Sequence, residues 1–337
     1  MINQVKLENF GPISGVDWSG LGKINLIIGG NGKGKTFLLK AIYCTLKTLE
    51  VYKRGHEQRT ASEILANKLY WTFQTEKIGD LVQKGADKLF CKIEFDGREF
   101  AYSFGKDTSK QILTLENHVD PRTSNSVFLP AKEVLSLHQI ILKTRQQDQV
   151  FGFDDTYYDL SQALSTSFTR GRIIEEFAAS RKKLKEFLGG TIEYEENAGR
   201  WLFVNASRQK FQIGVTAEGI KKIGILDTLL GNRYLDTSSV VIIDEPESAL
   251  HPMAISQLMD IIGILSERGL QFILASHSYF VVKKLHLLAQ EKGWSIPVLS
   301  AVKDGWRCDD LSQGMPENPI IQESVNLYEK EVELAFK

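Results

Sequence analysis

Short apolar runs that alternate with helical repeats mark the two ends of the chain. Residues 24–28 (INLII) form one run, which is followed by a glycine-rich loop and then by apolar residues at helical spacing. Towards the other end, the runs at 240–243 and 272–275 stand between segments of helical character. Strands alternating with helices are typical of an α/β protein with a buried parallel sheet. Within residues 1–55 the pattern predicts a strand, a loop, a strand, the glycine-rich loop and a helix.

In the middle of the chain the spacing of the hydrophobic residues changes from one segment to the next. Residues 56–85 are polar with helical periodicity, whereas residues 88–116 predict a β-hairpin and a further strand, with a turn at Asp96-Gly97. Residues 132–188 are again mostly helical. Three more strands are expected after them, at residues 191–194, 201–204 and 211–215. The middle therefore carries a β-rich lobe and an inserted helical lobe.

We expect these segments to form one compact body. Residues 1–55 and 210–337 are predicted to be the two halves of the core, and residues 56–209 an insertion between them. No internal repeat, low-complexity tract or linker separates two domains in the sequence. A last helix is expected over residues 325–336.

Composition narrows the class of protein. The 337 residues are 42% hydrophobic and 25% charged, and 41 Lys plus Arg against 42 Asp plus Glu give a net charge of −1. These values are those of a folded globular protein and exclude disorder and fibrous or disulfide-rich scaffolds. A near-neutral chain has no overall field that attracts nucleic acid or membranes, so DNA binding is left open and is not indicated by charge.

Two basic stretches do not change this view. Arg181-Lys182-Lys183 and Lys221-Lys222 are too short for a nucleic-acid groove. We interpret them as solvated helix faces.

The cysteines and the apolar segments indicate the compartment. Cys44, Cys91 and Cys308 lie far apart, in no metal-binding or redox spacing. The N-terminus lacks a basic start followed by an apolar run, and nowhere are there about 18 consecutive apolar residues. We therefore predict a cytoplasmic protein that does not span a membrane.

The glycine-rich loop carries the first chemical signal. Residues 29–36 (GGNGKGKT) satisfy G-x-x-x-x-G-K-[ST] after an apolar strand and before a helix, which is the context of a phosphate-binding loop. Backbone N–H groups of such a loop point at the β- and γ-phosphates, the lysine neutralises charge, and the hydroxyl ligates Mg²⁺. The residues expected to bind the nucleotide, with Thr36 also binding the metal, are Gly29, Gly30, Asn31, Gly32, Lys33, Gly34, Lys35, Thr36 and Phe37.

A β-branched strand that ends in two carboxylates is the second signal. Residues 240–243 precede Asp244 and Glu245, as in a buried parallel strand whose carboxyl end faces a ligand. Asp244 suits the Mg²⁺ site, and Glu245 suits a base that orients or deprotonates an attacking water. From Thr36 to Asp244 is 208 residues, so a large insertion separates the two motifs.

Four motifs together resemble the ABC-type ATPases of the RecF, SMC and OLD (overcoming lysogenization defect) group. They are LENFGPI at 7–13, the loop at 29–36, DEPESALHP at 244–252 and Ser276-His277-Ser278. The phrase DEPExxLHP is similar above all to stand-alone ATPases and OLD-like ATPase domains of bacterial anti-phage systems. The resemblance covers roughly residues 1–50 and 215–285.

The resemblance implies a P-loop ABC-type ATPase head that forms a homodimer, with two ATP molecules sandwiched between the copies. ATP and Mg²⁺ are the implied cofactors. His277 ends the strand beyond Asp244, so it would reach the γ-phosphate and act beside Glu245 as a catalytic residue.

A signature segment that faces the partner's nucleotide is implied at residues 216–222. Its expected contacts are Thr216, Glu218 and Gly219, before a helix over 222–230. The position of the usual signature serine is Ala217. Losing one charge-assisted hydrogen bond costs about 1.5–3 kcal/mol, which implies a weaker sandwich and slow hydrolysis. An ordinary helix start remains the alternative.

The glutamine loop of ABC heads has no clear counterpart. Residues 126–133 are similar to the strand and turn that carry it, yet they contain no glutamine. Two interpretations stay open. Glu133 or Lys132 replaces the glutamine, or Glu133 is a glutamate that stabilises a helix N-terminus.

The length of chain after the last motif shapes the functional hypothesis. Some 60 residues remain after His277, too few for the TOPRIM nuclease domain of OLD-like proteins, and sustained heptads of an SMC coiled coil are absent. We expect a slow, partner-regulated ATPase, the sensor of an anti-phage system that controls a separate effector such as a toxin or nuclease. The alternative is a RecF-like DNA-binding ATPase in repair or recombination.

Overall fold

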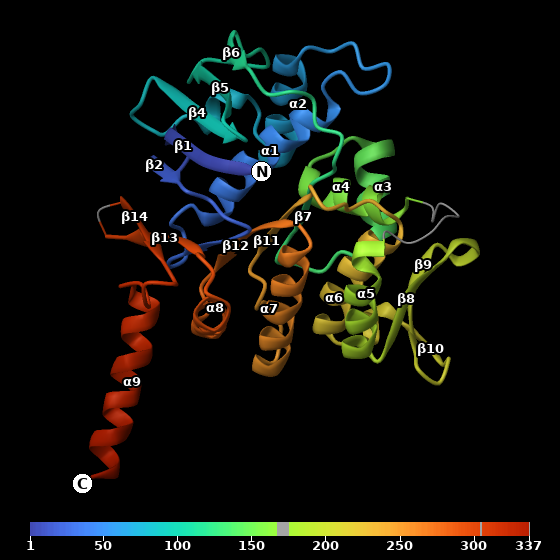
Figure 1. The fold of residues 1–337 in the computed structure, drawn as a ribbon. Helices are drawn as coiled ribbons and strands as arrows, with labels where there is room; N and C mark the ends of the chain where they lie inside the picture. Colours follow the sequence, from blue (N-terminus) through green and yellow to red (C-terminus); the bar gives the residue numbers. More distant parts are fainter. Residues whose placement is uncertain (167–174, 304, 337) are drawn as a thin grey trace.

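The computed structural model describes residues 1–166, 175–303 and 305–336. It is an α/β structure, as the sequence predicts, with an antiparallel sheet and two helices on one face of a central sheet and further helices on the other (Figure 1). The part of the predicted helical lobe between residues 167 and 174 lies outside the described residues.

The central sheet, as far as the chain is described, has six strands in the order β14-β13-β3-β12-β11-β7. β13 and β14 pair antiparallel, and the other neighbours pair parallel. The bounds are β3 (Ile24–Ile28), β7 (Val127–Leu129), β11 (Val240–Asp244), β12 (Gln271–Ser276), β13 (Pro297–Val302) and β14 (Gly305–Asp310). The three predicted apolar strands are therefore adjacent and parallel.

The strands β3, β12 and β11 end at one edge of this sheet. Ser276 pairs with Ile28, and Ala275 pairs with Asp244. Because parallel strands share one direction, the loops after all three strands emerge side by side.

Each of these strands is buried on both faces. In β12, Phe272 and Leu274 join the core on the helical side, whereas Ile273 and Ala275 join the core under the antiparallel sheet. Burial on two faces explains why the strands appear in the sequence as nearly continuous apolar runs, with Asn25 as the polar residue of β3.

The antiparallel sheet has the order β2-β1-β4-β5-β6. Its bounds are β1 (Ile2–Phe10), β2 (Ile13–Ser19), β4 (Lys88–Phe95), β5 (Arg98–Gly105) and β6 (Thr114–Asn117). The hairpin predicted within 88–116 is confirmed, and its first strand pairs with β1. The loop predicted after the first strand is wrong, because residues 13–19 form β2, which buries Ile13, Val16 and Trp18.

Helices cover both faces of the central sheet. The described helices are α1 (Lys35–Val51), α2 (Ala61–Phe73), α3 (His138–Lys143), α4 (Asp155–Leu164), α5 (Glu175–Leu188), α6 (Glu218–Gly231), α7 (Pro252–Glu267), α8 (Tyr279–Lys292) and α9 (Pro319–Ala335), with short turns at η1 (Ile78–Leu81), η2 (Thr144–Asp148), η3 (Glu196–Ala198) and η4 (Ile213–Val215). Two helices begin earlier than predicted: α6 at Glu218, and α9 at Pro319, after the capping side chain of Asn318. No helix in the described part of the chain combines the length and apolarity needed to cross a membrane.

A small sheet, β10-β9-β8, lies beside α5 and α6. Its strands are β8 (Gly190–Glu195), β9 (Arg200–Asn205) and β10 (Lys210–Gln212). The strand predicted over 211–215 is too long, since residues 213–215 form a 3₁₀ turn that buries Ile213 on the way to α6.

One buried glutamine joins the antiparallel sheet to the central sheet. The Gln271 amide accepts from Ile2 N at 2.8 Å and donates to Ile2 O at 2.8 Å and to Gly22 O at 2.9 Å. Gln271 is 1% exposed, so no water can replace these bonds.

We predict that Gln271→Ala lowers the free energy of unfolding by about 2–3 kcal/mol, because buried backbone groups of Ile2 lose their partners. Urea denaturation would show a lower midpoint with an unchanged slope. Gln58→Ala, at an exposed position, is the control. An unchanged midpoint for Gln271→Ala would show that this bridge does not stabilise the fold.

Candidate active site

The loop at residues 29–34 joins β3 to α1 and depends on glycine at two positions. Gly29 has φ 152° and lies so close to β13 that a Cβ would be 2.6 Å from the Cβ of Ala301. Gly34 has φ 94°, and a Cβ there would be 2.9 Å from Ile13 Cγ1. No side chain caps α1 at Gly34, so the N–H groups of the first helical turn remain available to an anion.

Lys35 is held inside this loop. Its Nζ donates to Gly29 O at 2.7 Å and to Gly30 O at 3.0 Å, and the residue is 7% exposed. Burial lowers the pKa of the ammonium, although nearby carboxylates, Asp244 first among them, act in the opposite direction. Among the residues that the structure describes, the ammonium has carbonyl acceptors but no carboxylate within ion-pair distance, an arrangement that a phosphate would complete.

Thr36 and Asp244 bring the two sequence motifs together. Thr36 Oγ1 donates to Asp244 Oδ2 at 2.8 Å, across the edge where β11 ends. Asp244 Oδ1 is buried without a hydrogen-bond partner, and burial raises the pKa of this carboxyl.

This pair fits the Mg²⁺ of a nucleotide. No group of three or more His, Cys, Asp or Glu residues forms a metal site within the described ranges. Mg²⁺ commonly takes one or two protein oxygens and fills its remaining positions with phosphates and water. The hydroxyl of Thr36 and the unpartnered oxygen of Asp244 are oxygen donors of that kind.

Three further side chains stand at the same edge. Glu245 has φ 48° and a side chain 35% exposed, and its N–H donates to Ala275 O at 2.9 Å. His277 directly follows β12, and its Nδ1 lies 3.6 Å from Glu245 Oε1 and 3.4 Å from Glu247 Oε1. These distances are contacts rather than hydrogen bonds. Glu245, His277 and the loop at residues 29–34 therefore all lie at one edge of the sheet.

Glu247 holds the segment that carries His277. Its Oε1 accepts from Ser276 Oγ at 2.9 Å and from the backbone N of His277 at 2.9 Å. Its Oε2 is buried without a partner. The sequence signalled a carboxylate here but not this contact, which depends on β11 and β12 lying side by side.

The residues of the predicted signature bond to their own segment of the chain. Within the described residues, no hydrogen bond or ion pair joins Thr216, Glu218 or Gly219 to residues 29–36. The first turn of α6 has no side-chain cap, since its N-cap is Ala217. Glu218 instead accepts from Lys221 Nζ at 2.7 Å.

A family model described as "AAA domain, putative AbiEii toxin, Type IV TA system" matches residues 24–283, well over half of the chain. The chain belongs to this family. It is thus a P-loop ATPase, and the matched range spans the loop, both carboxylates and His277.

The AAA-domain protein also has a relative of similar length. An "ATP/GTP phosphatase" of Helicobacter pylori (strain ATCC 700392 / 26695) is 22% identical over 345 residues, covering 88% of this chain and 90% of the relative.

Two solved structures share the fold. An SmcHead bound to the C-winged helix domain of ScpA has a TM-score of 0.53, with 15% identity over 92% of this chain and 97% of that chain. An Smc head domain with an extended coiled coil, bound to the C-terminal domain of ScpA derived from Pyrococcus furiosus, has a TM-score of 0.51, with 14% identity over 98% of each chain. The fold is that of a P-loop ABC-type ATPase head, as predicted.

The remaining loop residues take different positions in this AAA-domain protein. Asn31, Gly32 and Lys33 are exposed at the mouth of the loop. Phe37 packs its ring against Phe73 at a centroid distance of 5.0 Å, so its side chain has a packing partner.

The basic stretches predicted as solvated helix faces are in part internal. Arg181 Nε donates to Asp227 Oδ1 at 2.7 Å across α5 and α6, and both side chains are nearly buried. Lys221 and Lys222 are 5% and 9% exposed. The prediction is wrong for these three residues, because the faces they occupy are covered by neighbouring elements that the local sequence does not reveal.

The turn after β7 gives Glu133 a partner within its own segment. The carboxylate of Glu133 accepts from the backbone N of Ser136 at 2.9 and 3.1 Å. This bond lies within the turn before α3, whose N-cap is Leu137 and has no side-chain cap, so Glu133 closes a turn and does not cap the helix.

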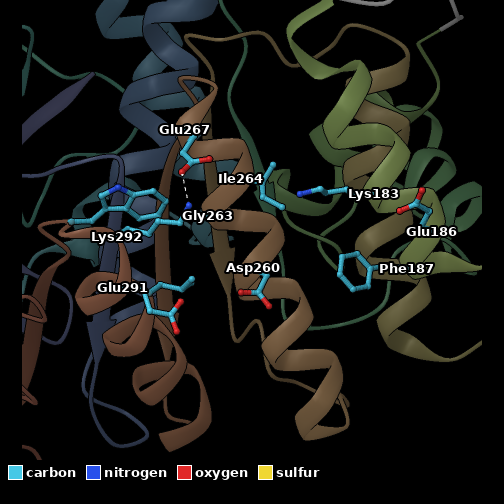
Figure 2. Close-up of a pocket in the computed structure, with 11 residues that line it drawn as sticks. Lys183, Glu186, Phe187, Asp260, Gly263, Ile264, Glu267, Glu291 and Lys292 are labelled. Carbon is cyan, nitrogen blue, oxygen red and sulfur yellow. Dashed lines mark hydrogen bonds and ion pairs between the residues drawn. The ribbon is translucent and has the colours of Figure 1, made fainter.

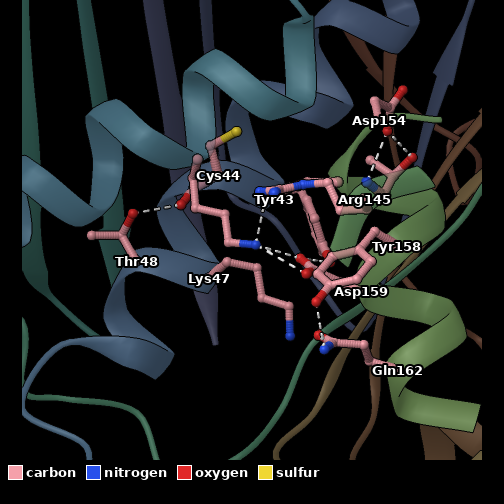
Figure 3. Close-up of polar contacts among 12 residues, drawn as sticks. Tyr43, Cys44, Lys47, Thr48, Arg145, Asp154, Tyr158, Asp159 and Gln162 are labelled. Atoms are coloured by element: carbon pink, nitrogen blue, oxygen red, sulfur yellow. Dashed lines mark hydrogen bonds and ion pairs between the residues drawn. The ribbon is translucent and has the colours of Figure 1, made fainter. Parts of the chain in front are cut away.

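A buried polar cluster that the sequence did not signal ties α1 to α4 (Figure 3). Tyr43 on α1 donates to Asp159 on α4 at 2.9 Å, and Lys68 on α2 donates to the same carboxylate at 2.7 Å. One turn nearer the loop, Lys40 donates to Asp154 at 2.7 Å. The helix that begins at Lys35 is therefore anchored to the helical lobe.

A groove of about 590 Å³ on the helical side is separate from this site (Figure 2). Its lining includes Phe187 of α5, Ile264 and Glu267 of α7, and Lys292 of α8. Glu267 ends α7, just before β12 begins, whereas the candidate site lies where β12 ends. The groove thus lies towards the opposite end of the sheet.

We predict that Lys35→Ala weakens ATP binding by at least about 100-fold, because charge-assisted hydrogen bonds to phosphate contribute about 1.5–3 kcal/mol each. Isothermal titration with ATP and Mg²⁺ measures this change. Lys23→Ala, at an exposed lysine before β3, should bind as the unmodified protein does. Equal affinities for the two variants would remove the phosphate role from the loop.

Proposed function

We propose that the protein hydrolyses ATP at the edge shared by β3, β12 and β11. The observation that carries this proposal is the bond from Thr36 to Asp244, with Glu245 and His277 on the adjoining strand ends. The proposed site combines a loop that binds phosphates, a pair of residues that binds Mg²⁺ and a carboxylate that acts as a base. These are the groups that attack of water on a γ-phosphate requires.

Each residue has a separate part in this reaction. The N–H groups of the α1 terminus and Lys35 bind the phosphates, and Thr36 with Asp244 holds the Mg²⁺. When bound, Mg²⁺ neutralises charge on the β- and γ-phosphate oxygens. Glu245 orients a water and accepts its proton, and its partial exposure leaves the carboxylate open to solvent.

His277 completes the proposed constellation. Its ring is 45% exposed and lies beside both Glu245 and Glu247. The Glu247 carboxylate fixes the His277 backbone, so the imidazole stands where it can donate to the γ-phosphate.

We further propose that two copies enclose the nucleotides. The first turn of α6, at Glu218 and Gly219 just after Thr216, has no side-chain cap, which supports its use towards the nucleotide of a second copy. Ala217 offers no hydroxyl, so the closed dimer would be weakly held and basal hydrolysis slow.

A separate effector is the proposed target of this cycle. The family description contains the words toxin and TA system. The two solved heads each have a bound ScpA domain, so heads of this fold are known to bind a second protein. Every motif recognised in this chain handles the nucleotide. We infer an ATPase component of a bacterial defence system that gates another protein. Arg181 does not support the RecF-like, DNA-binding alternative, because its guanidinium donates to Asp227 of the same chain.

We expect Glu245→Gln to keep ATP binding and to slow hydrolysis by roughly 10²–10⁴-fold, the usual range for losing a general base. Phosphate release measures turnover, and light scattering with ATP should show accumulated dimer. Glu291→Gln, at an exposed position, is the control. Unaltered turnover would move the base to another carboxylate, Glu247 first.

A test in cells addresses the effector. The purified protein should hydrolyse ATP and leave DNA, RNA and tRNA intact, while Lys35→Ala changes the toxicity of a co-expressed neighbouring gene product. Nuclease activity of the isolated chain, abolished by replacing a carboxylate other than Asp244, Glu245 or Glu247, would contradict gating of a separate effector. ATPase stimulation by DNA with a steep salt dependence would favour the RecF-like alternative instead.

A further inference from the structure

Lys222 makes an unusual set of contacts for a buried lysine. It lies in the second turn of α6, and its Nζ donates to Glu245 O at 3.0 Å, Ser248 O at 3.1 Å and Pro246 O at 3.4 Å. The residue is 9% exposed. Its ammonium therefore sits among carbonyls of the turn after β11.

That turn has a backbone that needs support. Glu245 has φ 48° and Ala249 has φ 58°, both in the left-handed region that residues with a Cβ seldom adopt. The N–H of Glu245 donates to Ala275 O of β12, and its C=O accepts from Ser248 N at 3.0 Å and from Lys222 Nζ at 3.0 Å. The backbone of Glu245 is thus held from both sides.

A lysine is a costly way to fill this position. Burial lowers the pKa of the Lys222 ammonium, with the carboxylates of Glu247 and Glu218 acting in the opposite direction. In the described part of the chain no carboxylate forms an ion pair with Lys222. If packing alone mattered, an apolar side chain would serve at lower desolvation cost. The contacts with the three carbonyls are what the lysine adds.

The first turn of α6 also lies against the segment after Glu245. A Cβ on Gly219 would be 3.4 Å from Leu250 Cδ2 and 3.5 Å from Ala254 Cβ, which is ordinary van der Waals contact. Helix α6 therefore runs close to this segment at Gly219 and contacts it through the hydrogen bonds of Lys222.

We propose that Lys222 is a positioning residue that fixes the backbone of Glu245 and links it to the start of α6. The inference rests on the proposed function, in which Glu245 is the base. Displacement of a reacting group by about 1 Å costs on the order of 100-fold in rate, so a small shift of this turn would suffice.

The test compares two buried lysines. Lys222→Met removes the donor and keeps an unbranched side chain that is one atom shorter, and Lys47→Met does the same on α1, where the partners are Glu50 and Tyr234. We expect Lys222→Met to lower kcat by roughly 10–100-fold while the Kd for ATP, measured by titration, stays within about threefold. Lys47→Met should lower the thermal midpoint and leave kcat near that of the unmodified protein. Equal kcat for Lys222→Met and the unmodified protein would overturn the proposal.

A double variant separates positioning from general damage. If Lys222 acts through Glu245, then Lys222→Met added to Glu245→Gln should leave the residual rate nearly unchanged. A merely structural role would lower the residual rate by the same factor in both backgrounds, and that result would also overturn the proposal.

A second substitution covers a failure to fold. Lys222→Gln keeps an amide donor, and its kcat should lie between those of Lys222→Met and the unmodified protein, with ATP affinity again retained. Two results would contradict the proposal that Lys222 positions Glu245. One is a Lys222→Gln protein with unaltered kcat, and the other is a Lys222→Gln protein in which kcat and ATP affinity fall by the same factor. If Glu245→Gln itself turned over normally, the proposed function would fail first, which distinguishes the two outcomes.

Discussion

The hydrogen bond between Thr36 and Asp244 joins residues 208 positions apart, and it exists because β3 and β11 flank β12 in one parallel sheet. Parallel pairing in register places the ends of all three strands at the same level. The phosphate loop, the carboxylates and His277 each come directly after one of these strands. The chain between the two motifs also contributes to this sheet, because β7 pairs with β11 at its edge.

Buried charges tie the surrounding helices to this edge. Tyr43 and Lys68 converge on Asp159, Arg181 pairs with Asp227, and Lys222 reaches the turn at Glu245. Such contacts contribute less to stability than apolar packing of the same volume would, but they form only when the two partners have a specific relative position. In this molecule they join α1 to α4, α5 to α6, and α6 to the carboxylate turn. A displacement of the helical lobe would therefore be transmitted along α1 and α6 to the two halves of the site.

The sequence predicted the strands and loops of this edge because their chemistry is local. Residues 24–28 and 240–243 are apolar since both faces of the sheet are buried, and the loop at 29–36 carries glycines that its backbone requires. It failed where the outcome depends on a distant partner. Strand β2 was missed because two exposed residues break its alternation, and Lys222 appeared solvated because nothing near it in the sequence shows the turn that covers it. The contact of Glu247 with Ser276 likewise exists only once two strands lie side by side.

The position of α6 bears on why such an ATPase would wait for a partner. Its first turn, with Gly219, faces the segment after Glu245 rather than the phosphate loop of the same chain. In the proposed function, one copy supplies Lys35, the Thr36–Asp244 pair and Glu245 to the nucleotide. In the proposed dimer, the second copy adds the first turn of its α6, and Lys222 connects the same helix to the base of its own site. Binding across the interface and the geometry of Glu245 would then be coupled, and hydrolysis would respond to whatever holds the two copies together.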